Sequence, residues 1–84
     1  MFNTFRNRRK HKTYEITFSL DNGRLVETHN VSFRSIDNLR VYSQMVQNDK
    51  VKIVDIYCVD DNADIALYKT DHGGQFAVMT FSRN

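Results

Sequence analysis

Cationic side chains crowd the N-terminal end of the chain, and their spacing suits the binding of phosphate groups. Five lie within seven positions, and the first twelve residues contain no Asp or Glu; the five are Arg6, Arg8, Arg9, Lys10 and Lys12. Unpaired cations at this density repel one another, and phosphate oxygens neutralise them with release of counterions. Phe2 and Phe5 flank the cluster and can stack on bases. We therefore predict that residues 1–12 form a flexible basic arm that binds nucleic acid or an acidic partner protein.

Residues 13–84 carry the opposite net charge. They hold seven Lys or Arg against ten Asp or Glu, which gives −3 within a chain of net charge +2. Asp60, Asp61 and Asp64 lie in or next to a predicted turn, where their carboxylates can face a basic surface. We predict that these three acids contact a partner. The arm has one further interpretation, a solvated tail without a binding role.

The spacing of the acids does not indicate a metal site. The D-x-N-x-D pattern at residues 60–64 is similar to the start of a calcium-binding loop, and Asp71 even occupies the twelfth position. The sixth position, however, is Ile65 instead of the glycine that the loop needs for its sharp bend. The three histidines and Cys58 are scattered without a short ligand pair, so zinc is not indicated either. We expect no metal and no cofactor.

Catalytic patterns are also missing from the sequence. Cys58 lies within the apolar run Ile56-Tyr57-Cys58-Val59, where a buried neutral thiol is more usual than a nucleophile. The chain has no phosphate-binding glycine loop and no G-x-S-x-G nucleophile elbow. We therefore expect a binding protein and not an enzyme.

The elements that must position these groups begin with a predicted hairpin. Residues 13–20 alternate apolar and polar side chains, which is typical of a half-buried strand. The Asn-Gly pair at positions 22 and 23 accepts the positive φ of a tight turn. A second strand is predicted at about residues 24–33. Polar residues interrupt its apolar face, so we expect a bulge or a bend near Thr28.

A helix is predicted to follow the hairpin. Ser35 is a suitable N-cap, and Asp37 in the first turn complements the helix dipole. Apolar residues then recur at helical spacing on one face, and they are Ile36, Leu39, Tyr42, Met45 and Val46. We expect this stripe to pack on the sheet.

Three further strands complete the prediction. Residues 51–59 form a near-continuous apolar run, which is typical of a central strand buried on both faces. Residues 64–70 and 75–82 follow after short turns, so neighbouring strands run antiparallel. The predicted fold is α+β, with one mainly antiparallel sheet of about five strands, one packed helix and the order β-β-α-β-β-β, in a single domain over residues 13–84. Its core is expected to contain Tyr14, Ile16, Phe18, Leu39, Tyr42, Val46, Val54, Ile56 and Val78.

The composition points to a cytoplasmic location. No apolar run reaches the roughly 18 to 20 residues that a membrane span needs, and no apolar signal core follows the N-terminal charges. One cysteine cannot form a disulfide within the chain, which suits a reducing compartment. We expect a protein of the bacterial host cytoplasm, neither membrane-spanning nor secreted.

In its short length, basic arm, compact sheet with one helix and acidic hairpin tips, the chain resembles the small inhibitor proteins that phages and mobile elements of Gram-positive bacteria encode. Anti-CRISPR proteins are among them. The resemblance covers the whole length and rests on overall organisation. It implies a stoichiometric inhibitor of a host nuclease or another nucleic-acid-handling complex, acting as a monomer or homodimer. Two alternatives stay open: a small DNA- or RNA-binding accessory protein of a phage or plasmid, and a self-associating structural protein whose edge strand pairs across a dimer.

Overall fold

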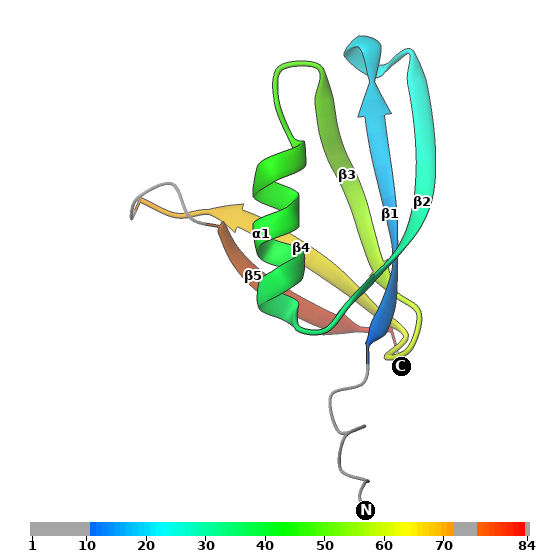
Figure 1. The fold of residues 1–84 in the computed structure, drawn as a ribbon, viewed down its shortest axis with the longest axis vertical. Helices are drawn as coiled ribbons and strands as arrows, with labels where there is room; N and C mark the ends of the chain where they lie inside the picture. The colour runs from blue at the N-terminus through cyan, green and yellow to red at the C-terminus, as the bar shows by residue number, and fades with distance from the viewer. Residues whose placement is uncertain (1–10, 72–75, 84) are drawn as a thin grey trace, which may run out of the picture.

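A computed structural model describes residues 11–71 and 76–83 of the chain. One antiparallel sheet of five strands carries a single α-helix on one face (Figure 1), as the sequence predicted. The elements run in the order β1 (Lys12–Leu20), the 3-10 turn η2 (Asp21–Gly23), β2 (Leu25–Phe33), α1 (Ile36–Val46), β3 (Val51–Cys58), β4 (Ala63–Lys69) and β5 (Phe76–Ser82). The order of strands across the sheet is β2-β1-β3-β4-β5. The α+β fold and the β-β-α-β-β-β order are therefore confirmed.

The β1–β2 hairpin has the turn that its sequence predicted and lacks the predicted bulge. Asn22 and Gly23 have φ values of 56° and 88°, which is the region that an Asn-Gly turn favours. The pairing then continues without a shift from Leu20 opposite Leu25 to Lys12 opposite Phe33. Of the bulge or bend expected near Thr28, the bulge is therefore wrong.

The bulge lies in β3 instead, and it corrects a second prediction. Thr17 of β1 is opposite Asp55, but the next residue, Phe18, is opposite Ile53, so Val54 is the extra residue. An extra residue inverts the alternation of side chains along a strand. Val54 and Asp55 are consequently both exposed, Val54 at 59%. The predicted burial of Val54, and of the 51–59 run on both faces, is wrong.

The core lies between α1 and the inner face of the sheet. Its buried apolar members are Tyr14, Ile16, Phe18, Leu39, Ile56, Cys58 and Ile65, and this confirms five of the predicted core positions. Tyr42, Val46 and Val78 pack against that cluster and are partly buried. Ile36 and Met45 of the predicted helical stripe are 42% and 78% exposed, so their predicted packing on the sheet is wrong. The Ser35 hydroxyl accepts a hydrogen bond from the Asn38 backbone N–H at 3.2 Å, so Ser35 is the predicted N-cap. Among the described residues, no helix is long and apolar enough to span a bilayer.

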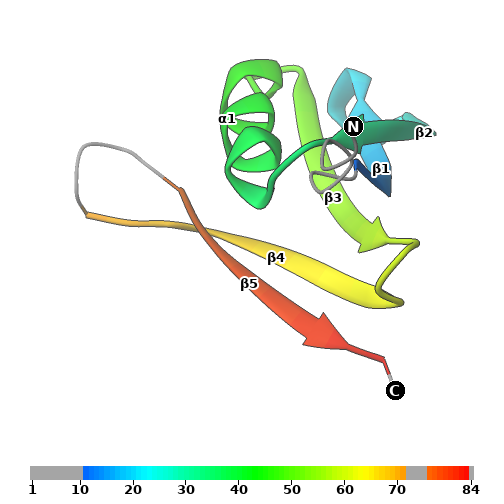
Figure 2. The same ribbon diagram turned by 60° about the horizontal axis from the view of Figure 1, so that its bottom comes forward.

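The sheet opens between its third and fourth strands. β3 pairs with β4 at two positions only, Tyr57 opposite Asp64 and Cys58 opposite Ala63. Beyond these positions the β4–β5 hairpin diverges from the rest of the sheet, as Figure 2 shows. A cleft of about 440 Å³ lies between β3 and β4, and Gln47, the C-cap residue of α1, is among the residues that line it. The hairpin therefore presents much of its surface away from the rest of the sheet.

Candidate binding site at the root of the basic arm

The structure places one of the five predicted arm cations. Arg6, Arg8, Arg9 and Lys10 lie outside the described residues. Lys12 is the first residue of β1, where it is opposite Phe33 of β2. The position of Lys12 therefore gives the point at which the arm joins the folded sheet.

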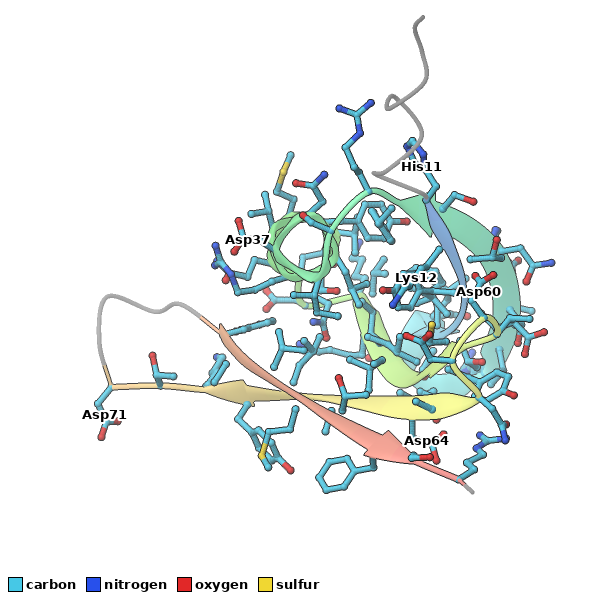
Figure 3. The ribbon with its side chains drawn as sticks, turned by 90° about the horizontal axis from the view of Figure 1, so that it is seen from below. His11, Lys12, Asp37, Asp60, Asp64 and Asp71 are labelled. Carbon is cyan, nitrogen blue, oxygen red and sulfur yellow. The ribbon has the colours of Figure 1, made fainter. Side chains whose placement is uncertain are left out.

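Two of the predicted partner-binding acids hold that point in place. The Lys12 ammonium lies 2.8 Å from Asp61 Oδ2, and the Thr13 backbone N–H donates to Asp60 Oδ2 at 2.6 Å. The backbone N–H of Val59 donates to the Thr13 carbonyl at 2.9 Å. Lys12, Thr13, Asp60 and Asp61 form a group that we call the arm root, and Figure 3 shows Lys12 beside Asp60. Acids of the β3–β4 turn thus anchor the start of β1.

The two charges of the Lys12–Asp61 pair perturb one another. The hydrogen bond and the charge of Asp61 raise the pKa of the Lys12 ammonium above its ordinary value. The hydrogen bond and the charge of Lys12 lower the pKa of the Asp61 carboxyl. Both side chains stay about half exposed. Lys12 is therefore charged at neutral pH, but a neighbour already compensates part of its charge.

The third predicted acid, Asp64, is paired with Arg83, the residue that follows β5. Arg83 donates from Nε and Nη2 to the Asp64 carboxylate at 2.6 to 3.1 Å, and these hydrogen bonds lower the pKa of Asp64. The guanidinium carbon of Arg83 lies 4.0 Å from the centroid of the Tyr57 ring. The Tyr57 hydroxyl donates to Asn62 Oδ1 at 2.6 Å. All three predicted acids therefore have partners within the chain, and their contact with another molecule stays a prediction.

Arg34 is a candidate residue that the sequence reasoning missed. It follows Phe33, which is opposite Lys12, and both cations line a pocket of about 260 Å³ together with Asp61. Arg34 is exposed, and no ion pair within residues 11–71 and 76–83 includes it. The sequence contains a signal for this position, because a tight turn at Asn22-Gly23 sets the register that places Phe33 opposite Lys12 and so Arg34 close to Lys12.

Comparison with protein-family models, with curated proteins and with solved structures found no match.

Within residues 11–71 and 76–83, no set of three or more His, Cys, Asp or Glu side chains is placed to hold a metal ion. Cys58 is buried as a free thiol. His29 Nε2 lies 3.0 Å from Glu27 Oε1, but both side chains are about half exposed on the edge strand β2. At the arm root, the structure provides a fixed, charged attachment point for the arm.

Proposed function

We propose that the chain is a non-catalytic binding protein and acts as a stoichiometric inhibitor of a nucleic-acid-handling complex. In this proposal the arm cations bind phosphates of the guide RNA or DNA held by the complex, and the acidic body docks on basic protein surface. The observation that carries the proposal is the arm root, where Asp60 and Asp61 hold the first residues of β1. The anchoring supports a binding role because it fixes the start of the arm relative to the docked body.

The division of charge supports the same proposal. The first twelve residues carry five cations and no acid, whereas residues 13–84 have a net charge of −3. A nucleic-acid channel presents both charge signs at close range, phosphates on the bound strand and Lys or Arg on the protein wall. A chain with a basic arm and an acidic body is complementary to both. Arg34 adds a positive charge on the folded domain, in the same pocket as Lys12.

In this proposal the three predicted partner-binding acids have two roles, one within the chain and one toward the partner. Asp60, Asp61 and Asp64 act first within the chain, where they hold the arm root and Arg83. Asp61 and Asp64 remain 45% and 43% exposed, so their carboxylates stay accessible at the surface of a docked body. Their contribution to a partner is then long-range attraction, which acts mainly on the association rate.

The test compares the full chain with a variant that lacks residues 1–10. Each is titrated by fluorescence anisotropy or biolayer interferometry against a guide RNA, a DNA duplex, a purified RNA-guided nuclease, and the same nuclease loaded with guide RNA. The deletion leaves Lys12 and Thr13 in place, so β1 and the arm root are intact. We expect the full chain to bind the loaded nuclease most tightly, and the deletion to weaken this binding at least tenfold.

Two results would contradict the proposal. Equal affinity for naked nucleic acid and for the loaded nuclease would favour the accessory DNA- or RNA-binding protein. Equal binding of the loaded nuclease by the full and truncated chains would make the arm a solvated tail. The control is a full-length variant in which the residues of the arm are scrambled and their composition is kept. It should bind as well as the native chain, because phosphate binding of this kind depends on charge and not on the order of the residues.

A further inference from the structure

The outer face of the β4–β5 hairpin is apolar and exposed. The register places Ala66 opposite Met79, Tyr68 opposite Ala77, and Phe81 opposite Asp64, all on the side turned away from α1. Tyr68, Met79 and Phe81 are 46%, 48% and 46% exposed. We call Ala66, Tyr68, Ala77, Met79 and Phe81 the hairpin face.

The fold does not require this face to be apolar. The alternate residues of the same strands, among them Ile65, Leu67 and Val78, already pack with the core. In β1 the outward positions are Thr13, Glu15, Thr17 and Ser19, which is the usual polar face of a half-buried strand. A hairpin that is apolar on both faces, with one face in water, is typical of a surface that binds another molecule.

Carboxylates border the hairpin face on the side of β1 and β3. Asp64 is opposite both Phe81 and Tyr57, and Tyr57 is opposite Glu15. Asp55 is exposed on β3 and is close enough to Arg83 to raise its pKa. Against these three acids the border has one cation, Arg83, which gives it a net charge of −2. The complementary surface is therefore apolar at its centre and basic at its edge.

A second copy of this chain does not have the basic edge that would complement the acidic border. A two-fold dimer through the hairpin face would bring two borders together, each with a net charge of −2. A partner with a basic rim avoids this repulsion.

We propose that the hairpin face is the docking surface for the protein component of the complex, a basic nucleic-acid-binding surface with apolar sockets for Met79 and Phe81. This inference rests on the proposed function and names the part of the body that meets the protein. The arm then contacts the nucleic acid, and the hairpin face contacts the protein. The two contacts are predicted to be separable.

The test uses the double variant Met79→Ser and Phe81→Ser in the full chain. Its control is Val26→Ser and Met45→Ser, two side chains that are 61% and 78% exposed on β2 and α1, away from the hairpin. Both are titrated against the purified nuclease without RNA, the loaded nuclease, and the guide RNA alone. Circular dichroism and thermal melting of both variants show whether each is folded.

We expect the hairpin-face variant to lose at least about thirtyfold in affinity for the RNA-free nuclease, as loss of a hot spot does, and to keep its affinity for RNA alone. The control should bind like the native chain. Native-like binding by a folded hairpin-face variant overturns this inference and leaves the proposed function standing.

If the variant does not fold, Asp55→Asn and Glu15→Gln replace it, and unchanged affinity and salt dependence overturn the inference. Failure of the native chain to bind any form of the nuclease overturns both proposals. A native chain that is dimeric in sedimentation and becomes monomeric in the double variant makes the face a self-association surface instead.

Discussion

The side-chain carbonyl of Gln44 in α1 accepts a hydrogen bond from the backbone N–H of Phe76 in β5 at 2.9 Å. Gln47, the C-cap residue that follows α1, accepts in the same way from the Ile53 backbone N–H of β3 at 3.0 Å. These two strand positions border the opening between β3 and β4. The helix therefore supplies hydrogen-bond partners where the sheet does not, and Gln44 ties the diverging hairpin to the body.

Replacing Gln44 with Ala should loosen the hairpin without unfolding the domain. The change leaves the Phe76 N–H without its acceptor and removes the contact from Arg40 Nη1 to Gln44 at 2.8 Å. We expect a loss of about 0.5–1.5 kcal/mol in the free energy of unfolding. Amide hydrogen exchange should accelerate in β5 and stay unchanged in β1. Gln47→Ala is the matched control, and its effect should be confined to β3.

Ser43 offers a substitution that should stabilise the protein. Its side chain is fully buried, and Oγ has no hydrogen-bond partner in the described part of the chain. Burial of an unpaired hydroxyl is unfavourable, and Ala has the better helix propensity. Ser43→Ala should therefore raise the unfolding free energy by about 1 kcal/mol and the melting temperature by about 4–8 °C. A lower melting temperature would mean that the hydroxyl has a partner in solution.

Ile56 and Val54 test the bulge in β3. Ile56 is 2% exposed within the core, whereas Val54 is the extra residue and points to solvent. Ile56→Ala should cost about 2–5 kcal/mol in chemical denaturation, because it leaves a cavity. Val54→Ala should change the unfolding free energy by about 0.5 kcal/mol or less. Similar losses for both variants would contradict the bulge.

The contrast between these two residues also shows how far the sequence could predict the fold. Periodicity was sufficient for β1, which buries one regular face. In α1 it placed Leu39 correctly, but Met45 of the same predicted stripe is 78% exposed and Ser43 is buried instead. It failed in β3, because a bulge is set by the pairing with β1 and leaves no mark in an apolar run such as Ile53-Val54. The pairing of Lys12 with Asp61 was equally hidden, since 49 residues separate the two. The acidic turn was visible in the sequence, but its internal partners depend on strand order.

The Asp64–Arg83 pair should make stability depend on pH at the acidic end. The hydrogen bonds from Arg83 lower the pKa of Asp64 in the folded state from 3.8. The pair therefore contributes stability that is fully present above pH 3.8 and is lost as the pH falls through the folded-state pKa. Urea unfolding between pH 2 and 7 checks this. Asp64→Asn should be less stable than the native chain at neutral pH, and the difference should shrink below about pH 4.

Arg34 should add one phosphate contact to those of the arm. It lines the pocket beside Lys12, and no described acid pairs with it. Arg24 is the matched control, because it is also exposed but lies next to η2, at the other end of the β1–β2 hairpin. Each released counterion contributes about 0.7–0.9 to the slope of log affinity against log salt. Arg34→Ala should therefore reduce the slope for the guide RNA by about 1 and weaken binding similarly for different sequences. Arg24→Ala should leave the slope unchanged. Equal effects of the two variants would show that affinity for RNA depends only on the total charge of the protein. Arg34 would then not be part of the binding site.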